Sequence, residues 1–167
     1  MAIFHTIVAA VDLSDMSTDV LDVARALAHQ NRAQLYVIHV VADPFHAMYA
    51  VETSGLDVPE LLAEWTLAAE DRLARLVQRH PLEAGLITTA VLAGSPAQEI
   101  VRYAADQRAD LIVVGSHGRP LVGRLLLGSV ADRVLHHAGR AVLVVPHRTA
   151  PATACEVSAA AAVGSVA

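Results

Sequence analysis

Residues 111–129 read LIVVGSHGRPLVGRLLLGS, and this stretch decides the fold class. It begins with the aliphatic run Leu111–Val114, whose short length and β-branched residues are typical of a buried parallel strand. Ser129 opens a helical pattern and is predicted to cap it. Gly115, Gly118 and Gly128 are among the glycines that lie between them. A strand, a glycine-rich loop and a helix N-terminus predict an anion site, because free N–H groups and the helix dipole favour phosphate.

The composition excludes the best-known phosphate-binding loop. The chain has 12 basic residues, and all of them are arginine. A Walker A loop needs a lysine on the β- and γ-phosphates, so a P-loop nucleotide hydrolase is excluded. Lysine Schiff-base chemistry is excluded for the same reason. The fingerprint G-x-G-x-x-G is also absent, which disfavours a Rossmann dinucleotide site.

Length and composition predict one domain with an aliphatic core. The chain has 167 residues, of which 54% are hydrophobic but only 4% aromatic. Its net charge of −5, without a basic patch, argues against a nucleic-acid partner. Cys155 is the only cysteine, so no internal disulfide forms and a reducing compartment fits. We read no signal peptide and no apolar run long enough for a membrane span, and we therefore expect a cytoplasmic protein.

Strand and helix patterns alternate along the chain. The predicted strands are Thr6–Val11, Leu35–Val41, Leu86–Leu92, Leu111–Val114 and Ala141–Val145. The first predicted helix follows the loop Ser14–Ser17 and ends near Asn31. The other predicted helices are Pro59–His80, Pro96–Arg108 and Val130–His137. This order predicts a single α/β domain over residues 1–147, with one parallel five-stranded sheet covered by helices on both faces. Residues 148–167 are alanine-rich and are predicted to form a disordered tail of unknown role.

Two loops at the carboxyl ends of the predicted strands carry binding chemistry, and parallel sheets bind ligands at that end. One loop is Gly115–Gly128. The other begins at Asp12, the first polar residue after five apolar ones, whose carboxylate suits ribose hydroxyls or Mg²⁺. Each feature has a structural alternative: the glycines turn the chain, Asp12 caps the first helix, and Arg119 and Arg124 are solvated rather than bound to phosphate.

Several segments in register resemble the universal stress protein family. They are Val-Asp-Leu-Ser-x-x-Ser after the first strand, Leu-x-Val-Ile-His-Val on the second, Gly-Ser-Pro before the third helix, Val-Val-Gly-Ser-His-Gly, Leu-Gly-Ser-Val-Ala-Asp-Arg-Val and the closing Val-Leu-Val-Val-Pro. The resemblance covers Phe4 to Pro146. Gly115, Gly118, Gly128 and Ser129 match the family's nucleotide motif Gly-x2-Gly-x9-Gly-(Ser/Thr). One departure is Pro120, which stiffens the loop and removes a donor.

The resemblance implies an adenine nucleotide alpha hydrolase-like fold with strand order 3-2-1-4-5 and an ATP site with Mg²⁺. Val40 would read the adenine edge through its backbone, while Ala10 and Asp12 would lie along the adenosine. The phosphate-side residues that it implies are Gly115, Gly118, Gly128, Ser129 and the N–H of Val130. Arg119, within the spacer of the motif, is a further candidate phosphate ligand because a guanidinium can bind phosphate.

The function that these features favour is an ATP-binding, homodimeric sensor or regulator in the stress response. The alternatives are a slow ATPase or self-phosphorylating enzyme of the same fold, and an interaction dimer that binds no nucleotide. No nucleophile–base pair is evident in the sequence, and the histidines lack metal-ligand spacing. The apolar strand Ala141–Val145 would form the dimer by antiparallel pairing, unless the tail folds back over it.

Overall fold

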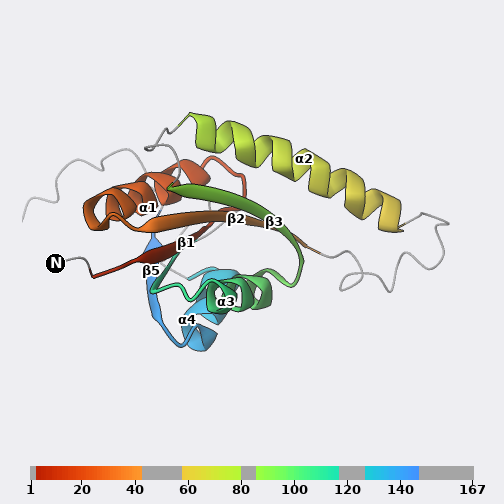
Figure 1. Cartoon of the computed structure of the whole chain (residues 1–167). Helices are drawn as coiled ribbons and strands as arrows, with labels where there is room; N and C mark the ends of the chain where they lie inside the picture. The colour runs from red at the N-terminus through yellow and green to blue at the C-terminus, as the bar shows by residue number, and fades with distance from the viewer. Residues whose placement is uncertain (1–2, 43–57, 80–85, 117–126, 147–167) are drawn as a thin grey trace, which may run out of the picture.

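The computed structural model describes residues 3–42, 58–79, 86–116 and 127–146, and strands and helices alternate along them (Figure 1). The strands are β1 (Thr6–Ala10), β2 (Gln34–Ala42), β3 (Ile87–Gly94), β4 (Leu111–Gly115) and β5 (Ala141–Val145). The helices are α1 (Ser17–Asn31), α2 (Val58–Gln78), α3 (Pro96–Asp106) and α4 (Ser129–His137). The predicted tail 148–167 lies outside the described residues.

The strands form one parallel sheet in the order β3-β2-β1-β4-β5. Ile7 at the centre of this order is paired with Leu35 on one side and Leu111 on the other. The strand order implied by the family resemblance is therefore confirmed. The winding direction reverses between β1 and β4, which places a topological switch point beside the end of β1.

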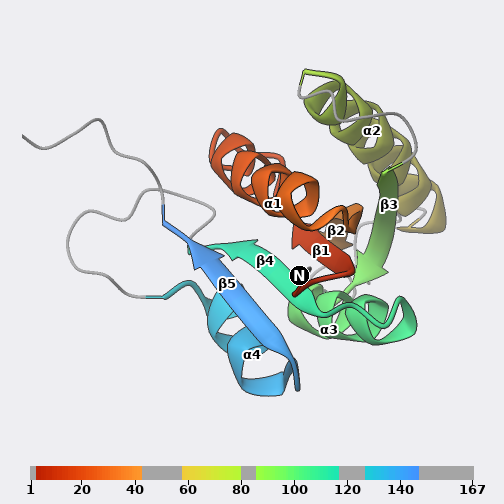
Figure 2. The same ribbon diagram turned by 60° about the vertical axis from the view of Figure 1, so that its left-hand side comes forward.

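Helices cover both faces of the sheet, as Figures 1 and 2 show. Side chains of β1 alternate between the faces: Ile7 and Ala9 belong to the cluster under α1 and α2, and Val8 belongs to the cluster under α3 and α4. β4 alternates in the same way. Because both faces of these strands are buried, their sequences are aliphatic throughout, as expected for a parallel sheet.

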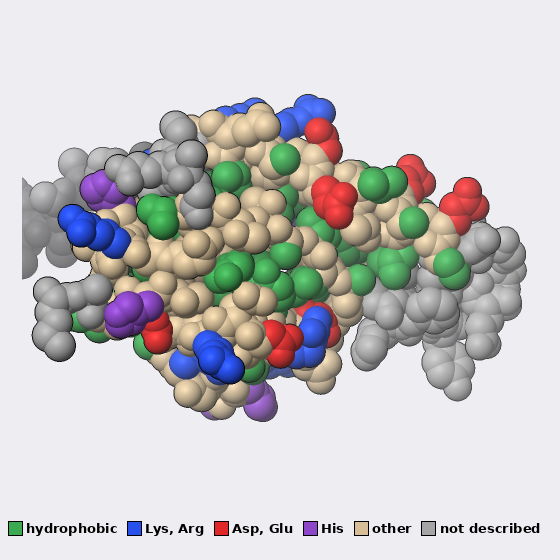
Figure 3. Space-filling view, viewed as in Figure 1, with side chains coloured by type: hydrophobic (Ala, Val, Ile, Leu, Met, Phe, Trp, Pro, Cys, Tyr) green, Lys and Arg blue, Asp and Glu red, His purple; other side chains and the backbone are tan. Residues whose placement is uncertain are grey.

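Helix α2 is only partly supported by the sheet. Ala69 and Leu73 are buried against β2 and β3, whereas Trp65 is 42% exposed and Leu67 is 67% exposed. The N-terminal half of α2 projects past the sheet in Figure 1, and acidic and apolar side chains lie side by side along it in Figure 3.

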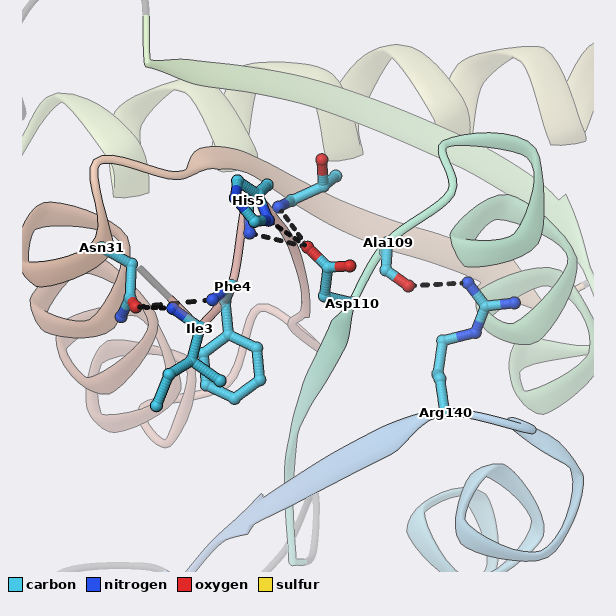
Figure 4. A network of polar contacts seen from close by, with 8 residues as sticks. Ile3, Phe4, His5, Asn31, Ala109, Asp110 and Arg140 are labelled. Atoms are coloured by element: carbon cyan, nitrogen blue, oxygen red, sulfur yellow. Dashed lines mark hydrogen bonds and ion pairs between the residues drawn. The ribbon is translucent and has the colours of Figure 1, made fainter. Parts of the chain in front are cut away.

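A polar network closes the amino ends of the strands (Figure 4). Asn31 Oδ1 accepts the N–H groups of Ile3 and Phe4, which joins the end of α1 to the chain before β1. Asp110 Oδ2 accepts the N–H groups of His5 and Thr6, at 2.6 and 3.0 Å. These two hydrogen bonds lower the pKa of Asp110.

Arg140 makes further hydrogen bonds at the amino ends of the strands, beside β4 and β5. Its guanidinium donates to the carbonyl oxygens of Ala104 and Ala109, and through Nε to Ala138. The end of α3, the start of β4 and the turn before β5 are thereby joined. This network lies at the opposite end of the sheet from the switch point, so it supports the fold rather than a ligand site.

The structure corrects some predicted helix boundaries. Ser129 was expected to cap the last helix, but it is the first helical residue and Gly128 occupies the N-cap. The cap lies one residue earlier because the carbonyl of Gly128 already accepts the N–H of Asp132. Ser95 is the N-cap of α3, as predicted, but its side chain makes no capping hydrogen bond. That helix ends at Asp106 rather than Arg108.

Candidate functional site

A cavity of about 260 Å³ opens at the carboxyl ends of β1, β2 and β4. This volume lies near the lower end of the range of about 300–1,000 Å³ typical of small-molecule sites. Its walls are mainly apolar and come from the ends of these strands and the first turns of three helices. The cavity therefore occupies the switch point, where an open parallel sheet binds ligands.

The N-termini of three helices converge on this cavity. Ser17 of α1, Pro96 of α3 and Val130 of α4 all line it. The first N–H groups of a helix have no acceptor within the helix, and its N-terminus carries partial positive charge. Three such ends around one cavity favour an anionic group such as phosphate.

Asp12 is the acidic residue of the lining, and hydrogen bonds fix one of its two carboxylate oxygens. Oδ1 accepts the N–H of Ser14 at 3.0 Å, the hydroxyl of Ser14 at 2.6 Å and the hydroxyl of Ser17 at 3.0 Å. Ser17 is 1% exposed, so this donor is held inside the protein. With Oδ1 committed, Oδ2 is the oxygen that Asp12 can offer to a ligand hydroxyl or a cation.

Asp12 does not cap α1. The N-cap of this helix is Met16, and Asp12 bonds to the loop and to the side chain of Ser17 instead. The alternative that Asp12 serves only as the cap of the first helix is therefore wrong. Its carboxylate organises the loop between β1 and α1.

His39 also lines the cavity and was not predicted as a site residue. Its Nδ1 lies 2.8 Å from the carbonyl oxygen of Val11. A carbonyl oxygen only accepts, so Nδ1 carries the proton and the neutral ring has its acceptor at Nε2. This hydrogen bond joins the end of β2 to the residue before Asp12. No local pattern signals it, because the two residues are 28 positions apart.

The N-terminus of α4 is arranged by a contact with the end of β4. The N–H of Gly128 donates to the carbonyl oxygen of Ser116 at 2.7 Å. The N–H groups of Ser129 and Val130 are then the first donors that α4 presents, because neither has an acceptor inside the helix. Gly128 has φ −62° and ψ 149°, an extended conformation that any residue adopts. A need for glycine here would therefore come from close approach of a ligand, not from the backbone conformation.

The structure brings five of the predicted site residues to the cavity lining: Ala10, Asp12, Val40, Gly115 and Val130. Gly128 and Ser129 lie directly before Val130 at the start of α4, but they are not part of the lining itself. Gly118 and Arg119 lie outside the described residues. Sequence analysis missed the apolar floor that α1 and α3 supply through Val20 and Ile100, because these positions look like ordinary core residues.

A second groove lies between α3 and α4, with a volume of about 480 Å³. This groove is larger than the first cavity, and its lining includes Arg102, Arg133 and His137. The guanidinium of Arg102 is bound by Glu99 and Asp106, which neutralise it locally. The groove includes no strand end and one helix N-terminus, at Ser95, so the first cavity is the stronger candidate site.

Within the parts of the chain that the structure describes, no three histidine, cysteine or acidic residues cluster to hold a metal ion. A cation at the cavity would therefore need ligands from a bound molecule in addition to Asp12. In the same residues, no helix is both long and apolar enough to cross a bilayer.

Comparison with known proteins identifies relatives of this chain. The model of the universal stress protein family matches residues 3–146. Universal stress protein MJ0531 of Methanocaldococcus jannaschii is 38% identical over 144 residues, covering 86% of this chain and 82% of that protein. The solved structure of hypothetical protein MJ0577 is similar with a TM-score of 0.74 at 25% identity, covering 89% of this chain and 99% of that one.

A second solved structure shows a ligand. It is a universal stress protein in complex with cAMP, similar with a TM-score of 0.55 at 26% identity, covering 86% of this chain and 97% of that one.

Proposed function

This chain belongs to the universal stress protein family, and from that premise we propose that it binds an adenine nucleotide, ATP with Mg²⁺, and acts as a nucleotide-dependent regulator in the stress response. One observation carries the proposal: Asp12, the end of β2 and the N-terminus of α4 line the same cavity. The complex of a related protein with cAMP supports an adenine nucleotide as the ligand class.

Each part of the cavity suits one part of the nucleotide. The apolar walls would hold the base, and the backbone of Val40 would bind its edge. The second carboxylate oxygen of Asp12 would accept a ribose hydroxyl. Gly115 would allow close passage of the sugar and α-phosphate, and the N–H groups of Ser129 and Val130 would bind the outer phosphates.

Magnesium fits this site only together with the nucleotide. Mg²⁺ is commonly bound through one or two carboxylates plus the phosphates of its nucleotide, keeping several waters. Asp12 is the one carboxylate among the described lining residues. We therefore expect the ion to arrive with ATP and to neutralise phosphate charge, with Asp12 as its nearest protein group.

The protein is proposed to work as a homodimer in the cytoplasm and to respond to nucleotide occupancy rather than to turn ATP over efficiently. Slow hydrolysis or self-phosphorylation is the alternative within the same fold. A steady-state assay separates them: phosphate release near about 1 per second, within the ordinary enzyme range, would replace the regulatory role by an enzymatic one.

Isothermal titration calorimetry tests the ligand. Wild type should bind MgATP, bind ATP more weakly with EDTA present, and bind GTP least. Ligand at 100 times its Kd should raise the free energy of unfolding by about 2.7 kcal/mol. Absence of binding to ATP and to cAMP, together with an unchanged Tm, overturns the proposal.

Variants locate the site. Asp12→Asn keeps an acceptor for Ser14 and Ser17 but removes the charge, so it should weaken MgATP binding without unfolding the protein. Gly118→Ala tests the loop residue that the sequence motif assigns. Asp15→Ala is the matched control, because Asp15 is exposed in the same loop and does not line the cavity. Equal affinities in all of these variants would place the site elsewhere.

A further inference from the structure

The loop between β1 and α1 contains a residue in an uncommon backbone conformation. Leu13 has φ +61°, in the left-handed region that side-chain-bearing residues rarely adopt. For a residue other than glycine this conformation is strained, so surrounding contacts must stabilise it. Leu13 directly follows Asp12, so its φ sets how the chain continues from Asp12 into the rest of the loop.

Two contacts stabilise this conformation. The side chain of Leu13 packs, partly buried, against the hydrophobic cluster under α1 and α2. Its carbonyl oxygen accepts a hydrogen bond from Nη2 of Arg72, at 2.9 Å. Arg72 belongs to α2 and is 59 residues away in the sequence.

The carbonyl of Leu13 lies between the two sets of bonds that fix Asp12. On one side, Val11 is bonded to β2 through both Ile38 and His39. On the other side, Ser14 and Ser17 donate to Oδ1 of Asp12. A change at Leu13 would alter the spacing of Asp12 from these serines and so move its carboxylate.

Neighbouring arginines on α2 are not equivalent. Arg75, one turn further along, bonds to Asp71 of the same helix in an exposed pair. Arg72 is also exposed, but its hydrogen bond goes from α2 to the main chain of the cavity loop. A guanidinium on a carbonyl oxygen is a charge-assisted hydrogen bond, which is stronger than a neutral one.

We propose that Arg72 is a positioning residue for the nucleotide site: its hydrogen bond to the Leu13 carbonyl maintains the loop conformation that directs Asp12 into the cavity. This inference rests on the proposed function, because the ligand that Asp12 would contact is the proposed nucleotide. Arg72 acts through the loop and does not itself line the cavity.

The first test needs no ligand. Amide-proton exchange of Ser14 and Ser17, followed by NMR, reports how firmly the loop is held, because both N–H groups are hydrogen-bonded within it. Arg72→Met should accelerate this exchange several-fold, the effect of losing one exposed charge-assisted hydrogen bond. Arg75→Met should leave it unchanged, and Arg72→Lys should restore part of the protection. Unchanged exchange in Arg72→Met overturns the inference.

The second test measures the consequence for binding. Arg72→Met should weaken MgATP binding by about five- to tenfold in a protein that otherwise unfolds at the same temperature as Arg75→Met. In the Asp12→Asn background, the same substitution should change the affinity much less, because it acts through Asp12. An equal loss in both backgrounds contradicts the positioning role.

The two proposals fail in different ways. If wild type binds no nucleotide, the proposed function is wrong, and the exchange measurement alone decides whether Arg72 holds the loop. If wild type binds nucleotide but Arg72→Met binds it equally well, the proposed function stands and the positioning role of Arg72 is wrong.

Discussion

The hydroxyl of Ser17 donates to Oδ1 of Asp12 at 3.0 Å, and Ser17 is almost completely buried at 1% exposure. The first residue of α1 is thereby joined to the loop that follows β1. Because Oδ1 of Asp12 is held in this way, Oδ2 is the oxygen left for a ligand in the cavity that Asp12 lines. The buried serine therefore holds the loop that lines the cavity as well as the start of the helix.

Ser17→Ala should weaken nucleotide binding several-fold and lower the free energy of unfolding by about 1 kcal/mol, because Asp12 loses a buried donor. Calorimetry and urea denaturation measure the two effects. Thr18→Ala, at the next position of the same helix, is the control and should leave the affinity near that of wild type. A normal affinity in Ser17→Ala would show that Asp12 needs no support from α1.

The homodimer prediction concerns β5, one of the two edge strands of the sheet (Figure 2). Val142, Leu143 and Val144 are only half-buried in the single chain. Antiparallel pairing of β5 with its own copy would cover them and satisfy the open edge. Light scattering should show a dimer for wild type and a monomer for Val144→Arg.

A second variant distinguishes loss of the dimer from unfolding of the Val144→Arg protein. Ala141 is exposed at the start of β5, so Ala141→Arg places a charge in the paired segment without entering the core. It should also weaken the dimer while circular dichroism remains native. A wild-type monomer, or a folded Val144→Arg dimer, would exclude β5 as the interface.

Asp110 gives a pH-dependent contribution to stability. Its pKa is lowered by the N–H groups of His5 and then of Thr6, so folding favours the ionised carboxylate. The resulting stabilisation is complete above the pKa of an unfolded aspartate and is lost as the pH falls through the lowered folded-state pKa. Asp110→Asn should thus melt below wild type at neutral pH, and the gap should close on acidification. A gap that is constant with pH would contradict this role.

Two glycines with positive φ should respond differently to alanine. Gly94 has φ +142°, and an added Cβ would lie 3.1 Å from Cγ of Glu99, whereas Gly139 has φ +61° and open space around it. Gly94→Ala should cost of order 1–3 kcal/mol, and Gly139→Ala about 1 kcal/mol. Gly139→Asn should cost less still, because asparagine tolerates this conformation. Thermal denaturation measures the loss of stability in each variant. Equal losses in Gly94→Ala and Gly139→Ala would refute the steric argument at Gly94.

Much of the fold follows from local patterns in the sequence. The aliphatic run Leu111–Val114 could be predicted as a buried strand because both of its faces are covered. The strand order depended instead on resemblance to a family, since periodicity does not say which strands are neighbours. The cap of α4 was misplaced because serine is a good N-cap by propensity, whereas the bond between Gly128 and Ser116 fixes where the helix begins.

The site was predicted less completely than the fold. Asp12 and Gly115 could be found because Asp12 directly follows a predicted apolar strand and Gly115 ends another, whereas Val40 came only from the family resemblance. His39 and Arg72 could not, because their partners Val11 and Leu13 are distant in sequence and meet them only after the sheet and α2 have packed. Such contacts are properties of the tertiary structure and leave no local pattern.

The central claim is that the cavity at the carboxyl ends of β1, β2 and β4 is the nucleotide site. Amide chemical shifts of ¹⁵N-labelled protein, recorded during titration with MgATP, test it most directly. The largest changes should occur at Asp12, Val40, Gly115 and Val130, while the signals of Asn31 and Asp110 at the opposite end stay fixed. Absence of shifts at saturating MgATP, or shifts confined to Arg102 and Arg133 in the groove between α3 and α4, would contradict the claim.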